Sequence, residues 1–169
     1  MGKIFDFRCL VLMTFLMLLF HKSSLAKGKE IVINPSIPLN EQLIYPKTKY
    51  VIQNDIDLEG VTVTLPYLAE LEIRKGVLSN GIIEGNSSYI SLKKNCLENV
   101  YIRDGVCSIS KKVKTSCYKG EFCGLLNSIC NICPNNGVVI MDKKNDYVID
   151  TPIVVRRSIS IIGRNSAHP

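Results

Sequence analysis

A constant spacing of 19 residues between apolar positions constrains the fold of this chain more than any other feature of its sequence. Between Val51 and Ser110, short runs rich in β-branched residues alternate with Gly, Asn and Pro, which predicts strands joined by tight turns. A series of apolar residues that recur at one constant spacing, here called an apolar track, indicates a structure that turns repeatedly in the same way. A shift of 19 residues brings Leu71 onto Ile90 and Ile109, Ile73 onto Leu92, Val63 onto Ile82 and Tyr101, and Leu58 onto Val77 and Cys96.

A coil explains this constant offset better than a meander of hairpins does. In a coil, each turn stacks its strands on those of the previous turn and adds apolar residues to one continuous core. A period of about 20 residues fits a parallel β-helix or a leucine-rich repeat, but the leucine ladder of that repeat is missing. We therefore predict an all-β fold, a parallel β-helix (solenoid). The alternative is an irregular β-sandwich whose offsets agree by chance.

The stretch Gly76–Asn86, "GVLSNGIIEGN", distinguishes the coil from the hairpin. Asn80-Gly81 between two apolar runs is typical of a β-hairpin with a type I′ turn. Val77 and Ile82, however, each belong to a track that repeats 19 residues away. The Asn-Gly and Gly-Asn steps are therefore predicted to be successive corners of a coil.

Residues 1–26 have the layout of a secretory signal peptide. Lys3 and Arg8 precede an apolar run over Cys9–Phe20, and small residues follow at Ser24 and Ala26. This run is shorter than the ~20 residues of a membrane span, although an uncleaved anchor is the alternative. We expect a secreted, periplasmic or cell-surface protein that has no membrane association after cleavage.

The charge pattern argues against a nucleic-acid partner. Without the signal, 18 basic and 14 acidic residues remain, Trp is absent, and no long basic run is interleaved with aromatics. The basic residues form scattered doublets, which are typical of solvated turns. A mild attraction for an acidic polysaccharide is compatible with this composition. The doublets are Lys93-Lys94, Lys111-Lys112, Lys143-Lys144 and Arg156-Arg157.

Six clustered cysteines in an exported chain indicate disulfides, whose pairing the sequence leaves open. Zinc is disfavoured, because Cys130-x-x-Cys133 is a lone C-x-x-C motif and the mature chain has one histidine, His168. No metal and no cofactor are predicted. An equally good interpretation is that some of these cysteines are small buried core residues. The disulfide candidates are Cys96, Cys107, Cys117, Cys123, Cys130 and Cys133.

A short amphipathic helix is predicted within the cysteine-rich segment. Helical spacing of apolar residues runs over roughly Glu121–Asn131, and Pro134 and Gly137 end the pattern. Cys123 and Cys130 would share the buried face of this helix, but two turns separate them by about 10.5 Å. Any disulfide from these two cysteines must therefore reach another element, such as Cys107 or Cys117.

The segment Tyr50–Ile90 resembles the start of secreted right-handed parallel β-helix proteins common in Bacteroides-type bacteria. The resemblance rests on "DIDLEG", "LSNG" and "IIEGN", and it departs from the family at "RKG", where a Gly pair is more usual. It implies that the predicted solenoid is right-handed. These motifs belong to the first coils of the family and not to a catalytic centre.

The later segment "GVVIMDKKNDYVIDTPIVVRRSISIIG" is similar to the beginning of the pectate-lyase-like superfamily module. The resemblance implies strands near Gly137–Ile140, Tyr147–Ile149, Pro152–Val155 and Ser158–Gly163. It also implies that the preceding helix caps the open N-terminal end of a coil. The family's acidic motif ahead of this helix is replaced by Lys119-Gly120-Glu121.

No catalytic residue can be carried over from this family. Its hydrolases use paired Asp carboxylates and its lyases use a Lys or Arg base, on coils that would begin where this chain ends, at Pro169. The carboxylates present are predicted to be turn or edge residues. They are Asp55, Asp57, Asp142, Asp146 and Asp150.

The expected function is that of an exported β-helix protein, a short or truncated relative of polysaccharide-acting (pectate lyase/polygalacturonase-like) proteins. Glycan binding is favoured over catalysis, and a retained activity would be that of a polysaccharide lyase or glycoside hydrolase. The alternative is a small non-catalytic structural or adhesive module held by disulfides. An uncapped C-terminal coil would favour self-association.

The predicted organisation has five segments. They are the signal peptide (1–26), an extended lead-in (27–48), the first coils (49–110), the cysteine-rich segment with its capping helix (111–136) and a truncated second module (137–169).

Overall fold

Parallel strands make up most of the structure, so the chain is mostly β with few helices, as predicted. The computed structural model describes residues 29–119, 125–142 and 152–163. Its strands form three sheets in which every pair of neighbours is parallel. The first sheet holds β1 (Glu30–Val32), β2 (Lys49–Ile52), β5 (Glu70–Ile73), β7 (Ser88–Ser91) and β9 (Val106–Ser108), in that order.

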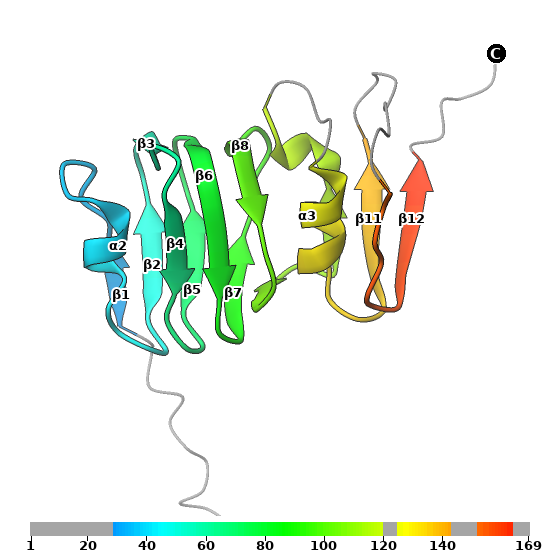
Figure 1. Cartoon of the computed structure of the whole chain (residues 1–169), viewed down its shortest axis with the longest axis horizontal. Coiled ribbons are helices and arrows are strands. Elements are labelled where there is room, and N and C mark those ends of the chain that lie inside the picture. The colour runs from blue at the N-terminus through cyan, green and yellow to red at the C-terminus, as the bar shows by residue number, and fades with distance from the viewer. Residues whose placement is uncertain (1–28, 120–124, 143–151, 164–169) are drawn as a thin grey trace, which may run out of the picture.

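The second sheet centres on the longest strand, β6 (Leu78–Gly85), and the third sheet follows along the chain (Figure 1). β6 pairs with β3 (Ile56–Asp57) and β4 (Thr62–Leu65) on one side and with β8 (Leu97–Ile102) on the other. The third sheet holds β10 (Lys112–Lys114), β11 (Gly137–Met141) and β12 (Ile159–Gly163). The helices of the described segments are α2 (Leu39–Gln42), the 3₁₀ turn η1 (Thr115–Cys117) and α3 (Leu126–Ile132).

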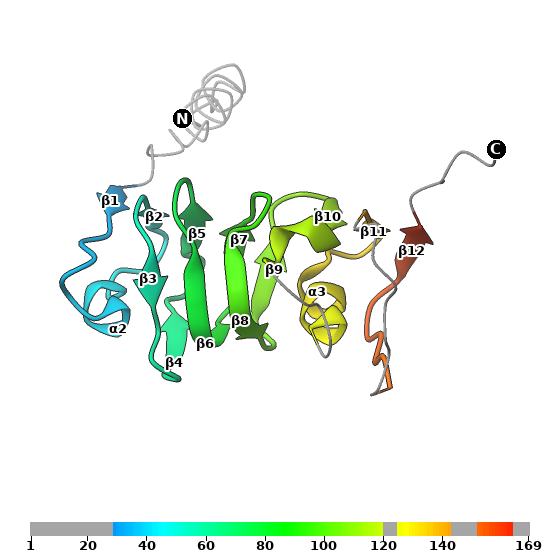
Figure 2. The ribbon, with the colours of Figure 1, turned by 90° about the horizontal axis from the view of Figure 1, so that it is seen from above.

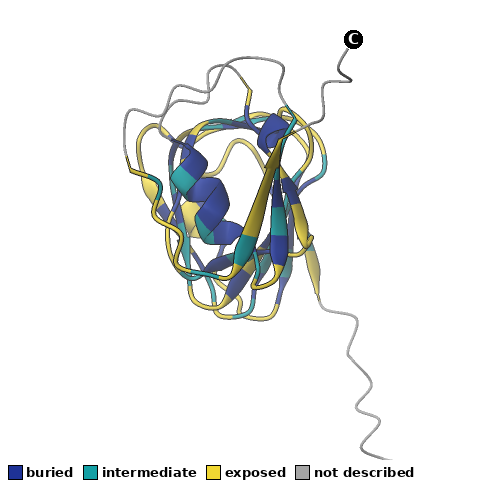
Figure 3. Cartoon of the chain, turned by 90° about the vertical axis from the view of Figure 1, so that its right-hand side faces the viewer, coloured by how far each residue is buried: buried dark blue, intermediate teal, exposed yellow. Residues whose placement is uncertain are grey.

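From β2 to β9 the chain passes alternately between the first and second sheets, which lie as two layers in Figure 2. Inward side chains from both layers fill one core, and in Figure 3 the buried parts of the chain surround it. Leu71 and Ile90 are aligned neighbours in the first sheet and are fully buried. Ile83 and Ile102 are the corresponding pair in the second sheet.

The 19-residue period is confirmed at some positions and wrong at others. Leu71 pairs with Ile90, and Ile82 pairs with Tyr101, as predicted. Ile90 pairs with Ser108 and not with Ile109, because the offset between β7 and β9 is one residue shorter.

Two further predicted alignments are wrong because the connections before and after β4 are longer than their counterparts in the next turn of the chain. Val63 pairs with Ile83 and not with Ile82, because the chain from Leu65 to Glu70 is one residue longer than the chain between their partners, Gly85 and Tyr89. Four residues separate β3 from β4, and they include Glu59 and Gly60 at positive φ. Leu58 therefore does not align with Val77, since the neighbouring pair is Ile56 with Leu78. A change of one residue moves a side chain to the other face of a sheet.

Asn80-Gly81 is a corner within one strand and not a hairpin turn. β6 continues through both residues, and Asn80 adopts a left-handed φ of 52°. Asn80 donates from Nδ2 to Asp57 Oδ2 at 2.9 Å, and Asn99 donates from Nδ2 to Asn80 Oδ1 at 3.3 Å. The backbone N–H of Glu59 and the Asn80 amide lower the pKa of Asp57. A ladder of polar side chains therefore links this corner in successive layers.

The predicted helix is present as α3, and its capping role stays a prediction. Residues 121–124 of the predicted range lie outside the described residues, and the helix runs on to Ile132. α3 packs against β8 and β9 and continues the layer of the second sheet (Figure 2). Ser128 Oγ accepts a hydrogen bond from Ile102 N at 3.1 Å, so the helix covers the outer edge of β8.

The strands predicted in the last segment are confirmed in part. β11 and β12 match the prediction, and 147–149 lies outside the described residues. Pro152–Val155 is not a strand, because an asparagine of α3 takes the place of a strand partner. Asn127 accepts from Val154 N at 2.8 Å and donates to Pro152 O at 3.1 Å.

The start of the described chain is more structured than the extended lead-in that the sequence predicts. β1 pairs with β2, and α2 follows it. Leu39 and Leu43 are buried and extend the core beyond β2. In the described part of the chain, no helix has the length and apolar character needed to cross a membrane. The predicted signal peptide lies outside the described residues.

An ion-pair network crosses the outer face of the first sheet. Lys49 Nζ lies 3.2 Å from Glu70 and 3.0 Å from Glu72, and Arg74 contacts Glu72 at 2.9 Å and Glu30 at 3.2 Å. Hydrogen bonds from Arg74 and then from Lys49 lower the pKa of Glu72 to about 2. Ion pairs as well as backbone hydrogen bonds therefore connect strands that are far apart in sequence.

This network predicts acid sensitivity. Because the pKa of Glu72 is lower in the folded chain, its stabilising effect is complete above its unfolded pKa and is lost as the pH falls toward about 2. We expect wild type to lose more unfolding free energy between pH 7 and pH 3 than Glu72→Gln loses. Urea unfolding at several pH values measures this difference. Equal losses in the two proteins would contradict the role assigned to Glu72.

Candidate anion-binding groove

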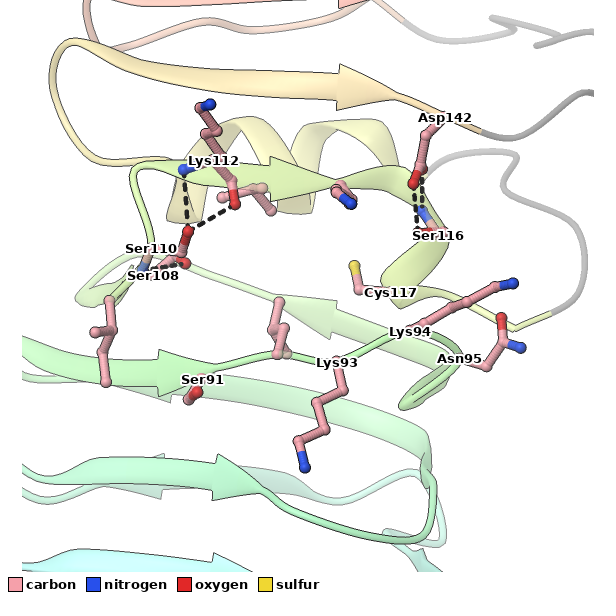
Figure 4. Close-up of a pocket in the computed structure, with 14 residues that line it drawn as sticks. Ser91, Lys93, Lys94, Asn95, Ser108, Ser110, Lys112, Ser116, Cys117 and Asp142 are labelled. Carbon is pink, nitrogen blue, oxygen red and sulfur yellow. Dashed lines mark hydrogen bonds between the residues drawn. The ribbon is translucent and has the colours of Figure 1, made fainter. Parts of the chain in front are cut away.

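A groove of about 860 Å³ lies where the first sheet ends and the third begins (Figure 4). In the described chain, β9 pairs with β7 but not with β10, so the stacking of strands is interrupted here. One end of the groove is closed where Asn95 N donates to Ser116 O at 2.8 Å. At the other end, the corner between β9 and β10 forms the wall.

Four lysines line this groove and come from two separate segments. Lys93 and Lys94 follow β7, while Lys112 and Lys114 belong to β10. Side chains alternate in a strand, so the burial of Val113 leaves both β10 lysines on the exposed face. Figure 4 shows Lys93 and Lys94 along one wall and Lys112 along the other.

Two of the four basic doublets expected in scattered turns, Lys93-Lys94 and Lys111-Lys112, lie in one strip with Arg74-Lys75. The register of β5 with β7 extends to place Arg74-Lys75 beside Lys93-Lys94, and Lys93 Nζ donates to Arg74 O at 2.8 Å. Lys111-Lys112 follows β9 at the corresponding corner. The recurrence of doublets at the strand period was the signal in the sequence that could have predicted this strip.

Asp142 is the carboxylate among the lining residues, and hydrogen bonds hold it in place. Its Oδ1 accepts from Ser116 N at 2.8 Å and from Thr115 Oγ1 at 3.2 Å, and its Oδ2 accepts from Ser116 Oγ at 2.7 Å. Burial alone would raise the pKa of Asp142, but these hydrogen bonds outweigh burial and lower it. Asp142 is therefore an ionised anchor between β11 and η1, and the turn that the sequence predicts after it lies outside the described residues.

Serine hydroxyls also line the groove. Ser110 Oγ donates to Lys112 O at 2.9 Å and accepts from Lys112 N at 3.1 Å, and Ser108 Oγ accepts from Ser110 N at 3.2 Å. These bonds fix the corner that leads into β10. The side chains of Ser108 and Ser110, together with those of Ser91 and Asn95, add hydroxyl and amide groups to the lining beside the lysines. Such groups can hydrogen-bond to a polar ligand.

The remaining predicted carboxylates have structural roles or lie outside the described residues. Asp55 Oδ1 accepts from Val77 N at 2.8 Å, and Asp57 holds the corner described above. Asp146 and Asp150 lie outside the described residues. Among the residues that the structure describes, no group of three or more His, Cys, Asp and Glu side chains is arranged to hold a metal ion.

The cysteine candidates are distributed over several elements. Cys123 lies outside the described residues, and no disulfide joins any two of the other five. Cys96 and Cys130 are buried, and burial raises the pKa of each thiol to about 11. These two behave as core residues, which was the alternative interpretation of the cluster. A disulfide framework remains a prediction.

Comparisons of the chain with known protein families, with curated proteins and with solved structures found no match.

Proposed function

We propose that this chain is a right-handed parallel β-helix of the pectate-lyase-like type, exported from the cell, that binds an acidic polysaccharide in the basic groove. The strand arrangement supports the β-helix part of this proposal. The chain returns to the first sheet after each passage through the second, and all neighbouring strands are parallel. Crossover connections between parallel strands are right-handed in about 98% of cases.

The basic groove supports the second part of the proposal, the binding of an acidic polysaccharide. Four lysines and one carboxylate, Asp142, line the groove, and the charge of Asp142 is already engaged by Thr115 and Ser116. An excess of positive charge in a concave site attracts polyanions. A polymer with repeated carboxylates can contact several lysines at once, and such multivalent contact strengthens binding beyond that of any single contact.

Binding fits the groove better than catalysis does. Hydrolysis of a glycosidic bond needs two carboxyl groups on either side of that bond. Among the described residues that line this groove, Asp142 is the single carboxylate, and its oxygens are turned toward Thr115 and Ser116. The groove can therefore hold a sugar acid through its charge and hydroxyl groups, whereas its described lining does not supply the paired carboxylates of a hydrolase.

Charge reversal on β10 tests the proposal. We expect Lys112→Glu combined with Lys114→Glu to weaken binding of polygalacturonate at least about tenfold. An exposed charge pair at 4 Å contributes about 1 kcal/mol, and about 1.4 kcal/mol corresponds to tenfold. Isothermal titration calorimetry at low and moderate salt measures the affinity, with neutral dextran as the uncharged ligand.

A second double variant separates position from net charge. Lys47 and Arg103 are exposed and do not line the groove, so Lys47→Glu with Arg103→Glu changes the net charge equally. We expect this control to bind polygalacturonate nearly as wild type does. Equal losses in both variants would mean attraction by net charge alone. If wild type binds neither polymer, the proposal is wrong and the structural-module alternative gains support.

A further inference from the structure

Two cysteines outside the groove are brought together by one arginine. Arg157 Nη1 lies 3.4 Å from Cys107 Sγ and 3.2 Å from Cys133 O. Cys107 belongs to β9, whereas Cys133 follows the last residue of α3. Arg157 itself lies just before β12. Three elements that are distant in sequence therefore meet at this point.

The two thiols differ in access. Cys107 is partly exposed, while Cys133 is fully buried. Burial raises the pKa of Cys133, the nearby Cys107 raises it further, and Arg157 opposes both effects. A guanidinium beside a thiol favours the thiolate, which is the species that reacts with disulfides. Cys107 is therefore the accessible member of a pair whose second member is shielded from solvent.

We propose that Cys107 and Cys133 form a disulfide by exchange with a low-molecular-weight disulfide such as oxidised glutathione. The Cys107 thiolate attacks one sulfur of the oxidant, which releases one thiol and leaves a mixed disulfide on Cys107. The Cys133 thiolate then attacks Cys107 Sγ, and the second thiol leaves. Two cysteine thiols are oxidised, and one disulfide of the oxidant is reduced to two thiols.

This bond would connect the C-terminal end of α3 to β9, the last strand of the first sheet. It would close a loop that includes β10, η1 and α3. A covalent loop of this size restricts the unfolded chain and so stabilises the folded one. The assignment is independent of the proposed polysaccharide binding, because neither cysteine lines the groove.

Mass spectrometry of the full chain tests the pairing. The reduced protein is incubated with oxidised and reduced glutathione, and the remaining thiols are then alkylated. Trypsin cuts after Arg103, Lys111, Lys119 and Lys143, so the expected cross-link joins peptide 104–111 to peptide 120–143. We expect wild type to lose two thiols and to gain this cross-linked species.

Single variants identify the second cysteine, because peptide 120–143 contains three. We expect Cys123→Ala and Cys130→Ala to keep the cross-link, and Cys133→Ala or Cys107→Ala to abolish it. A cross-link that survives Cys133→Ala, or a fully oxidised sample without one, would overturn the assignment. Far-UV circular dichroism of each variant shows whether it is folded. If a variant does not fold, tandem fragmentation of the wild-type cross-linked peptide locates the disulfide instead.

The role of Arg157 is tested by kinetics. We expect Arg157→Gln to slow disulfide formation severalfold at pH 7 and to move its rate profile to higher pH, because the Cys133 thiol loses the positive charge that lowers its pKa. Arg157→Lys should restore part of the rate. An unchanged pH profile in Arg157→Gln would show that this arginine does not activate the pair.

Discussion

We expect Gly105→Ala to lower the free energy of unfolding by about 3 kcal/mol or more, and Gly60→Ala to lower it by about 1 kcal/mol. Both glycines have a left-handed φ, 84° at Gly105 and 79° at Gly60. For alanine, this left-handed conformation costs about 1–2 kcal/mol of free energy. A Cβ at Gly60 would meet no atom within 4 Å, whereas one at Gly105 would overlap the carbonyl of Gly85.

The overlap cannot be relieved by a side-chain rotation, because both partners are backbone. Gly105 O accepts from Ser88 N at 2.8 Å, and Asp104 O accepts from Gly85 N at 3.3 Å. Moving either segment would break these bonds between successive layers. Urea unfolding of the two variants measures the difference. Similar losses at both positions would show that left-handed conformation, and not close backbone approach, makes Gly105 necessary.

Ile83→Ala is expected to cost about 3 kcal/mol, whereas Ile82→Ala is expected to cost less than about 1 kcal/mol. Ile83 is fully buried and aligned with Val63 and Ile102 in the core. Truncation of a buried isoleucine removes apolar contacts and leaves a cavity, which costs about 2–5 kcal/mol. Ile82 lies on the opposite face beside the exposed Tyr101.

This pair is a test of register, because the two residues are adjacent and chemically identical. Chemical denaturation with matched m-values gives both free energies. The apolar tracks read from the sequence place Ile82 in line with Val63 and therefore predict the reverse order of effects. If Ile82→Ala were the more destabilising variant, the alignment of β4 with β6 described above would be wrong.

The sequence predicts the local character of this fold well, because composition and spacing determine it. Alternating β-branched residues predict strands, and the recurrence that joins Leu71 to Ile90 predicts their neighbours. The extra residue between Leu65 and Glu70 could not be placed, since a corner can lengthen without altering the pattern of the strands that it connects. That one residue is sufficient to exchange the inner and outer faces for Ile82 and Ile83.

Sequence patterns could not predict the contacts between residues that are distant in the chain. Nothing local indicates that Asn127 substitutes for a strand partner of Val154, or that Arg157 meets Cys107. The lysines of the groove were visible as doublets, but solvated turns and a continuous strip have the same composition. The strip became visible when the strand offset was applied to charged residues as well as to apolar ones.

The interruption between β9 and β10 has a consequence for cooperativity. In a stacked array, each layer is stabilised mainly by its immediate neighbours, so stability is approximately a sum of nearest-neighbour terms. Where one such term is weakened, the two sides can open separately. The backbone hydrogen bonds from Asn95 N to Ser116 O, from Cys96 N to Cys117 O and from Lys119 N to Leu97 O cross this boundary, together with the packing of α3 against β8 and β9. The protein is therefore expected to contain two folding units, and the groove lies at their junction, where small relative movements can adjust its width.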